Sequence, residues 1–337
     1  MNLAADDDAD LAAPSSPSPP TSSWTAPPAI ELDHVSRWYG QVLGLQDVTL
    51  RVHGGVVGLL GPNGAGKSTL LRLLAGIIRP SRGRALVFGR DAHDDRAARR
   101  RIGYCPEHEG VWDDLTAREF VTLLGQLSGL STRDARRRAE ETLVELGLSA
   151  AIDRRLGGFS KGMRQRTKLA ATLTHDPDLI LLDEPLTGCD PLARMSIVAK
   201  TRALAQAGKT IVLSSHVLHE VEALTQEIVL IHRGQVLAEG NVHRVRELID
   251  EHPHRVRVEC DRPRELATRL LVADHVTRVE VDAGACLLET RAPDRLYDEL
   301  PRAALALGVR VSRLTSPDDN LAAVFEYLTA AKGPTRR

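Results

Sequence analysis

The sequence predicts an α/β protein built on a largely parallel sheet, with a helical insertion and a small α+β domain at its C-terminal end. Short apolar runs at 56–60 (VVGLL), 211–215 (IVLSS) and 227–232 (EIVLIH) alternate with helix-length segments, which is typical of strands covered by helices on both faces. Between residues 112 and 174 this alternation gives way to helical periodicity, and after residue 250 a different order of elements begins.

The composition is that of a globular chain without an overall charge preference. Of 337 residues 42% are hydrophobic, and 44 basic residues nearly balance 45 acidic ones, so no global field attracts nucleic acid or anionic lipid. Four cysteines occur without a CxxC pair, which indicates reduced thiols rather than a zinc site or a disulfide framework. No apolar run approaches the ~18 residues of a membrane-spanning helix.

The first 28 residues are acidic and then rich in proline and serine, so we predict a disordered tail with none of the features of a signal peptide. The main domain is predicted for 29–250, with its helical subdomain at about 112–174, and the C-terminal domain for 251–337. Within the subdomain, Ser131 followed by Asp134 is a helix start signal and Gly147 a stop signal.

The segment GPNGAGKST follows the strand at 56–60 and opens a helix, which is the context that the GxxxxGK[ST] pattern requires. Its glycines let the backbone turn N–H groups toward a phosphate, and the helix N-terminus adds roughly half a positive charge. We expect Lys67 to contact the β- and γ-phosphates and Ser68 to contact Mg²⁺. The binding residues expected here are Gly61, Pro62, Asn63, Gly64, Ala65, Gly66, Lys67, Ser68 and Thr69.

Two further strand ends carry candidate catalytic groups. The buried strand at 179–182 is followed by Asp183 and Glu184, expected to hold Mg²⁺ through water and to accept the proton of an attacking water, respectively. Alone, such a pair would equally fit a solvated turn, but the phosphate loop favours the functional interpretation. His216 follows the strand at 211–215 and is expected to contact a γ-phosphate, although an isolated histidine there is more often structural; His219 is given no role.

The segment FSKGMRQR, residues 159–166, allows two interpretations. Ser160 and Gly162, ahead of a helix expected to start near Met163, could bind a phosphate held by a second copy of the chain. Alternatively, Ser160 is an ordinary helix cap and the basic residues that follow, Arg164, Arg166 and Lys168, form a solvated face. Local chemistry leaves both open.

After residue 250 the pattern reads strand (255–260), helix (262–272), two strands, helix (293–306) and strand, a βαββαβ order, with a last helix, NLAAVFEYLTAA, beyond it. Residues 254–315 contain 11 arginines against 10 acidic residues, and a single aromatic ring, that of Tyr297. This argues against an RNA platform, so no nucleic-acid partner is expected. A dimer brace or regulatory cap is the preferred interpretation.

Taken together, the motifs GPNGAGKST, FSKGM, LLDEP, TGCDP and SSH resemble, in that order, those of the ATP-binding subunits of ABC transporters over residues 29–245. The resemblance implies a P-loop ATPase that uses ATP and Mg²⁺, and a second ATP-binding subunit in a homodimer or heterodimer. Each ATP would then lie between one subunit's phosphate loop and its partner's Ser160, Lys161, Gly162 and Met163.

The resemblance also assigns residues outside these loops. Tyr39 would stack on adenine, with Trp38 as the fallback and core packing as the alternative, and Asp190 would cross the dimer seam. Glu107 stands where the family usually has a glutamine that senses both Mg²⁺ and the membrane partner. A carboxylate can still accept from metal-bound water, but it adds negative charge beside the triphosphate.

The C-terminal unit and its ending SPDDNLAAVFEYLT resemble drug-export and ABC-2-type ATP-binding subunits. This implies an ATPase that powers export through an integral-membrane permease, peripheral on the cytoplasmic face of the cell membrane. The alternative is an ABC-type ATPase that acts as a soluble nucleotide switch on a nucleic-acid or ribosomal partner. That class carries two ATPase units or long heptad coils, and this chain shows neither.

Overall fold

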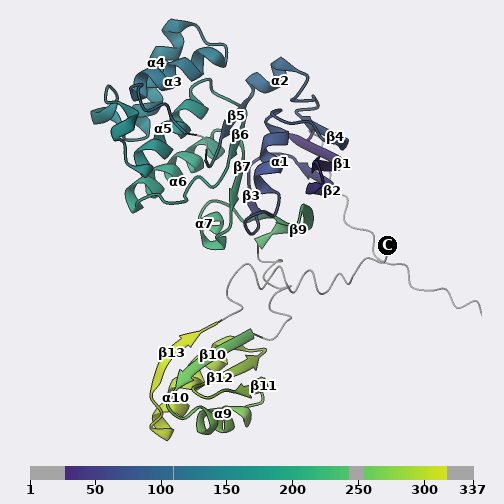
Figure 1. Cartoon of the computed structure of the whole chain (residues 1–337), viewed down its shortest axis with the longest axis vertical. Coiled ribbons are helices and arrows are strands. Elements are labelled where there is room, and N and C mark those ends of the chain that lie inside the picture. The colour runs from purple at the N-terminus through teal and green to yellow at the C-terminus, as the bar shows by residue number, and fades with distance from the viewer. Residues whose placement is uncertain (1–26, 109, 243–253, 317–337) are drawn as a thin grey trace, which may run out of the picture.

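A computed structural model describes residues 27–108, 110–242 and 254–316 (Figure 1). The predicted tail, except for residues 27 and 28, and the predicted last helix lie outside the described residues. No helix within the described part combines the length and the apolarity needed to cross a bilayer.

The main domain is built on a six-stranded sheet with the order β5-β6-β7-β3-β8-β9. Its strands are β5 (Ile102–Cys105), β6 (Leu179–Leu182), β7 (Thr210–Ser215), β3 (Val56–Leu60), β8 (Glu227–His232) and β9 (Gln235–Asn241). The first five are parallel, and β9 returns antiparallel beside β8. Every residue of β6 and β7 is buried, so β6 and the centre of β7 (residues 211–213) read as continuous apolar runs in the sequence. The α/β prediction is confirmed.

A second sheet, which the sequence did not indicate, packs beside the first. It has the order β2-β1-β4, with β1 (Ile30–Tyr39), β2 (Val42–Val52) and β4 (Arg82–Val87), all antiparallel. Its buried side chains share one core with α1 (Lys67–Leu74) and with one face of the parallel sheet. Register shifts along β1, and a positive φ at His34 and Asp47, break the alternation that would have revealed these strands.

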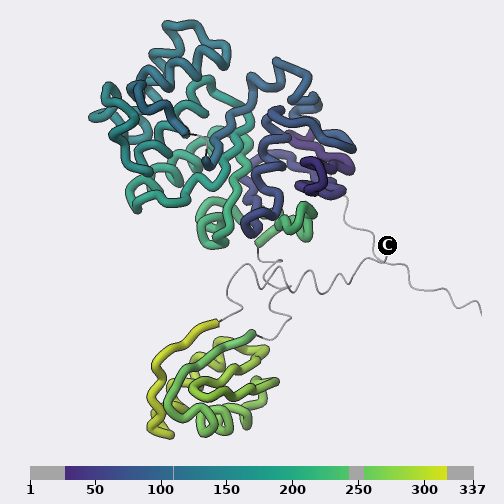
Figure 2. Tube along the Cα trace, viewed as in Figure 1, coloured from purple at the N-terminus to yellow at the C-terminus, as the bar shows by residue number. Residues whose placement is uncertain are grey.

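The predicted helical insertion is confirmed between β5 and β6, where Figure 2 shows the chain passing through a group of helices. They are α3 (Ala117–Leu127), α4 (Thr132–Glu145) and α5 (Lys161–Leu173), with two short 3₁₀ turns, η1 (Ser149–Ala151) and η2 (Leu156–Gly158). Ser131 caps α4 by accepting from Asp134 N, as its sequence indicated, and Thr116 forms a capping box with Glu119 at α3.

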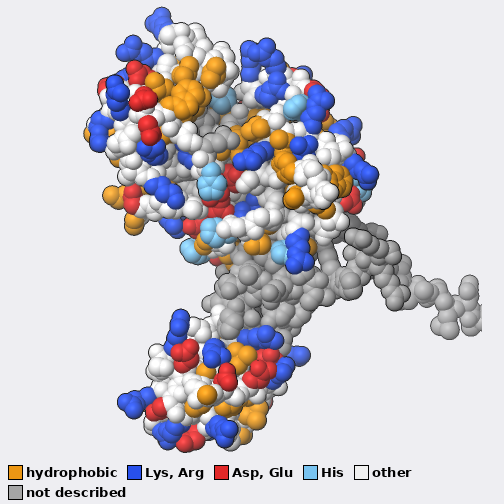
Figure 3. All heavy atoms as spheres, in the orientation of Figure 1, with side chains coloured by type: hydrophobic (Ala, Val, Ile, Leu, Met, Phe, Trp, Pro, Cys, Tyr) orange, Lys and Arg blue, Asp and Glu red, His pale blue; other side chains and the backbone are white. Residues whose placement is uncertain are grey.

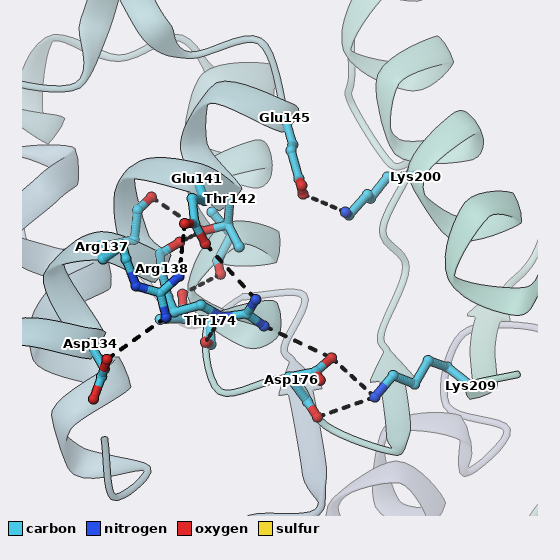
Figure 4. A network of polar contacts seen from close by, with 12 residues as sticks. Asp134, Arg137, Arg138, Glu141, Thr142, Glu145, Thr174, Asp176, Lys200 and Lys209 are labelled. Carbon is cyan, nitrogen blue, oxygen red and sulfur yellow. Dashed lines mark hydrogen bonds and ion pairs between the residues drawn. The ribbon is translucent and has the colours of Figure 1, made fainter. Parts of the chain in front are cut away.

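Ion pairs tie this insertion to the sheet (Figure 4). Arg138 of α4 donates to Thr174 O at 3.2 Å and lies 3.9 Å from Asp176, which in turn pairs with Lys209 at 3.0 Å. Lys200 of α6 (Pro191–Gln206) pairs with Glu145 at the end of α4. The carboxylates of these ion pairs are at least half exposed. We therefore expect the pairs to contribute little to the free energy of folding and mainly to orient the insertion.

The C-terminal unit has the element order that the sequence predicted, with its own core. It comprises β10 (His254–Cys260), α9 (Pro263–Leu271), β11 (Val276–Val281), β12 (Ala285–Thr290), α10 (Pro293–Leu307) and β13 (Val311–Thr315). The strands form an antiparallel sheet, β11-β12-β10-β13. Alternate residues of β10, among them Val256 and Val258, are buried together with Leu266 and Leu296 of the two helices. The described residues of the main domain also form two short helices, α2 (Arg96–Arg100) and α7 (Leu218–Glu222).

Candidate functional site

The phosphate loop joins the end of β3 to the start of α1. Gly64 has φ 78° and Gly66 has φ 110°, and a Cβ on Gly66 would lie 2.7 Å from Gly44 O, so this turn requires glycine. Gly66 precedes α1, and no side chain of the described part caps that helix. Its first N–H groups are therefore left for an anion, which is the arrangement that a triphosphate needs.

Lys67 is buried and folds back over the loop. Its Nζ donates to Gly61 O at 2.6 Å and to Pro62 O at 3.3 Å. The same Nζ lies 3.1 Å from Glu184 Oε1, a close ionic contact without the geometry of a hydrogen bond. The structure therefore brings the phosphate loop and the carboxyl end of β6 together through one ion pair.

The Glu184 carboxylate is the centre of a cluster drawn from three strand ends. Its Oε2 lies 3.0 Å from His216 Nδ1 and accepts from Thr187 Oγ1 at 3.1 Å. The side chain is 4% exposed, whereas that of His216 is 44% exposed. Glu184 also has φ 47°, a left-handed backbone conformation that costs energy in a non-glycine residue and recurs at functional sites. The two predicted catalytic residues are thus in contact.

Asp183 and the backbone of Glu184 are held by Ser214, which the sequence analysis did not identify. Ser214 Oγ donates to Asp183 Oδ1 at 2.7 Å and accepts from Glu184 N at 2.9 Å. Tyr104 OH lies 3.5 Å from Asp183 Oδ2. Parallel register pairs Leu182 with Leu213, so Ser214 comes to lie beside Asp183 once the two strands are adjacent.

We expect Ser214→Ala to lower turnover while nucleotide binding is kept, because the two acidic residues lose their shared support. The buried Glu184 N–H would be left unsatisfied, at a cost of about 1–3 kcal/mol in the free energy of unfolding. Urea unfolding and steady-state ATPase assays measure the two effects. Ser215→Ala is the matched control, since it breaks the buried Ser215–Glu220 bond of 2.9 Å instead. If both variants lost turnover equally, Ser214 would have no special positioning role.

The FSKGM segment forms the start of α5. Ser160 is exposed and caps the helix by accepting from Met163 N at 3.3 Å, so the helix begins at Lys161 and not near Met163 as expected. The cap of the alternative interpretation is therefore present, but its basic residues are only partly exposed and are bound to other parts of the domain. Arg164 pairs with Asp113 at 2.7 Å, Arg166 donates to Leu146 O at 3.1 Å, and Lys168 donates to two carbonyls of the loop after β5.

The TGCDP segment lies directly beside FSKGM on the same chain. Asp190 caps α6 by accepting from Ala193 N at 2.8 Å, and a Cβ on Gly162 would lie 2.7 Å from Asp190 Oδ2. The Lys161 side chain likewise lies against Gly188. Within the described residues no hydrogen bond or ion pair joins Ser160 to the phosphate loop of its own chain.

Two further predicted residues lie at strand ends, Tyr39 at the end of β1 and Glu107 in the loop after β5. The Tyr39 ring is partly exposed under the Arg37 guanidinium, 4.9 Å away, and it lies against Gly44 near Thr69. Trp38 instead lies under Arg82, at 5.4 Å. The Glu107 carboxylate lies 3.2 Å from His108 Nε2. This contact is with its neighbour in the chain and not with the predicted magnesium ligand Asp183. The described residues contain no cluster of three His, Cys, Asp or Glu side chains suited to a metal.

Comparison with known proteins identifies the family of this chain. A family model described as ABC transporter matches residues 45–187. The daunorubicin/doxorubicin resistance ATP-binding protein of Streptomyces peucetius is 38% identical over 268 residues, which are 79% of this chain and 81% of that protein. The chain belongs to the ATP-binding proteins of ABC transporters. It is the ATP-binding subunit of such a transporter, and an ATPase.

Other relatives of this ATP-binding subunit agree. The Nod factor export ATP-binding protein I of Rhizobium sp. (strain N33) is 37% identical over 83% of this chain and 92% of its own length. A solved ATP-binding subunit of an ABC transporter matches with a TM-score of 0.60 and 32% identity, over 66% of this chain and 93% of that one. An ATP-binding cassette solved as a dimer in a post-hydrolysis state with ADP and Pi matches with a TM-score of 0.58 and 26% identity, over 63% and 98%.

Proposed function

We propose that this ATP-binding subunit powers the export of a substrate through a separate membrane-spanning partner, and that it works on the cytoplasmic face of the cell membrane. Two relatives that match most of its length are described as a drug-resistance and a Nod factor export ATP-binding protein. The observation that carries the proposal is an apolar groove between the sheet and the helical insertion, suited to a segment of the partner. The nucleotide-binding unit is proposed to span 29–250 and the C-terminal unit 251–337.

The groove has a volume of about 610 Å³ and is lined mainly by apolar side chains from β5, the loop after it, α3 and α5. Trp112 is 52% exposed and packs edge-on against Phe120, with ring centroids 5.9 Å apart. Hydrophobic side chains gather on the surface of the insertion in Figure 3. An aromatic anchor of this kind at the edge of a groove supports the docking of another protein.

The groove is also connected to the ATPase site. Lys168 of α5 donates to Pro106 O at 2.8 Å and to Glu107 O at 2.9 Å. The loop that borders the groove is thereby tied to α5, the helix that Ser160 caps. A shift of α5 on nucleotide binding would then move the surface that the partner contacts.

Replacement of Trp112 by a photo-crosslinking amino acid in the intact cell tests the partner. We expect a cross-link to a protein with several membrane spans, and Trp112→Glu should remove the ATP-binding subunit from washed membranes while the purified ATPase stays active. Leu305→Glu is the matched control, because Leu305 is 82% exposed on the C-terminal unit, outside the groove. A cross-link to a ribosomal or DNA-binding protein would instead support the alternative of a soluble switch.

In the ATPase site, Ser68 and the buried Asp183 are proposed to hold Mg²⁺, which would neutralise part of the charge of the triphosphate. Both are oxygen donors of the kind that Mg²⁺ prefers, and Asp183 already accepts from Ser214. Lys67 would leave Glu184 for the phosphates, Glu184 would take the proton of the attacking water, and His216 would orient that water. Tyr39 is proposed to stack on the adenine, and Glu107 to sense Mg²⁺ through water.

We infer that the site is completed by a second ATP-binding subunit. Ser160, Lys161 and Asp190 are all exposed and lie beside one another, but no polar contact joins Ser160 to the phosphate loop of its own chain. Exposed Leu192 and Met195 of α6 continue the same surface. Head-to-tail pairing would bring Ser160 and Gly162 of one chain onto the γ-phosphate held by the other.

Cys189 reports on this pairing. It is half-buried in the loop before Asp190, whereas Cys105, Cys260 and Cys286 are buried. Burial raises the pKa of Cys189 and raises that of Cys105 to about 11. Because the thiolate is the nucleophile, a raised pKa leaves little of it at pH 7 and more as the pH rises.

We therefore expect a thiol reagent to label Cys189 first, faster at pH 9 than at pH 7, with Cys105 resisting at both. Addition of MgATP to a hydrolysis-deficient variant should slow labelling of Cys189, since the partner covers it. Mass spectrometry of labelled peptides measures each rate, with MgADP as the control. Equal labelling of Cys189 with and without MgATP would argue against a seam at this loop.

A further inference from the structure

A groove of about 520 Å³ lies between α9 and α10 of the C-terminal unit, outside the ATPase site. Its volume is within the usual range for sites that hold small molecules, roughly 300–1,000 Å³. One face of α10 lines most of it, with Arg302 and Glu299 beside the small residues Ala303 and Ala306. Arg269 of α9 faces them, and both helices pack on the same sheet (Figure 1).

His275 lines this groove, and its ring nitrogens make no hydrogen bond. Its side chain is 4% exposed, and neither ring nitrogen has a hydrogen-bond partner. Asp274 Oδ1 and Glu299 Oε2 lie 3.5 Å from Nδ1 and Nε2, at ion-pair distance but outside hydrogen-bond geometry. A buried polar ring left in this state is costly unless a further group meets it.

The arginines of the groove differ in how far they are already neutralised. Arg295 pairs with Asp274 at 3.1 Å, and Arg269 reaches Glu299 only at 3.7 Å. Arg302 has no polar partner within the described residues, nor has Asp298 one turn earlier on α10. One guanidinium thus remains available to an anionic group, and Asp298 to a donor on the same molecule. The His275 ring lies beside them, and its nitrogens face carboxylates without a hydrogen bond to either.

We propose that this groove binds a small molecule through a carboxylate or phosphate group, held by Arg302 and His275 with support from Arg269. The inference is independent of the ATPase site. It gives the C-terminal unit a ligand-sensing role that its core and sheet do not otherwise explain.

The test uses the full chain with ¹³C-labelled histidine, and the probes are inorganic phosphate and acetate at constant ionic strength. The resonance of His275 is assigned by its loss in His275→Gln. We expect a saturable shift of this resonance with one or both probes, and the responding probe identifies the group. Arg302→Gln should lower the affinity for that probe by at least about tenfold, as expected when one charge-assisted hydrogen bond is removed.

Arg313→Gln is the matched control, because Arg313 is exposed on β13 and does not line the groove; it should leave the titration unchanged. Binding of phosphate to Gly61–Thr69 does not interfere, since the observed ring is in the other unit. A shift that fails to saturate with either probe, or one that Arg302→Gln leaves intact, would overturn the proposal.

Discussion

Glu184→Gln is expected to reduce ATP turnover by about 10²–10⁴-fold, the range of a lost general base, while ATP binding is retained. The amide keeps the shape of the side chain but cannot accept the proton of water. It also removes the ionic contact of 3.1 Å with Lys67, so Lys67 is freer to hold the phosphates. Because bound ATP is no longer consumed, an ATP-bound dimer should accumulate.

Steady-state phosphate release measures turnover, a nucleotide-binding assay measures ATP affinity, and light scattering measures the amount of dimer. Glu227→Gln is a suitable control, since Glu227 is exposed at the start of β8 and lies outside the site. An unchanged hydrolysis rate in Glu184→Gln would remove Glu184 from the role of base. Loss of ATP binding together with turnover would point instead to a purely structural role in holding Lys67.

A mixture of Lys67→Ala and Ser160→Arg subunits should be active although each variant alone is not. Lys67→Ala damages the phosphate loop of the chain that carries it. Ser160→Arg blocks the start of α5, which a chain is proposed to place on the nucleotide of its partner. In a mixed dimer one site receives both defects and the other receives neither. If the sites act independently and subunits exchange freely, half of the pairs have one intact site, giving about a quarter of wild-type activity.

The design distinguishes shared sites from sites complete within one chain. If each subunit hydrolysed ATP alone, Ser160→Arg would keep its activity and mixing would only dilute it. Ser312→Arg, on exposed β13 of the C-terminal unit, controls for the added charge away from the proposed seam. Absence of recovery on mixing, with subunit exchange verified by two affinity tags, would contradict the shared-site account.

The buried parallel strands, the phosphate loop and the helix caps were predictable from sequence because each depends on local chemistry. Continuous apolar runs, the spacing of Gly61 to Ser68, and Ser131 with Asp134 need no partner in space to be recognised. The C-terminal order of strands and helices followed for the same reason, since β10 alternates clearly between buried and exposed residues.

What the sequence could not give depends on distant contacts. The sheet formed by β1, β2 and β4 is hidden by register shifts and by a long separation between β1 and β4. Ser214 acquires its role only when β7 pairs with β6 and places it against Asp183, 31 residues away in the chain. The sequence allowed the basic residues after Ser160 to be interpreted as a solvated face. In the structure Arg164 donates to Asp113 and Lys168 to Pro106 O, which lie 51 and 62 residues away in the chain.

The central proposal is that nucleotide bound in one chain's phosphate loop is completed by the start of α5 of another. The most direct measurement is a structure of Glu184→Gln with MgATP. We predict a two-chain particle in which Ser160 Oγ lies within hydrogen-bond distance of the γ-phosphate on the partner's phosphate loop. A tight dimer with ATP bound and Ser160 far from either triphosphate would contradict it.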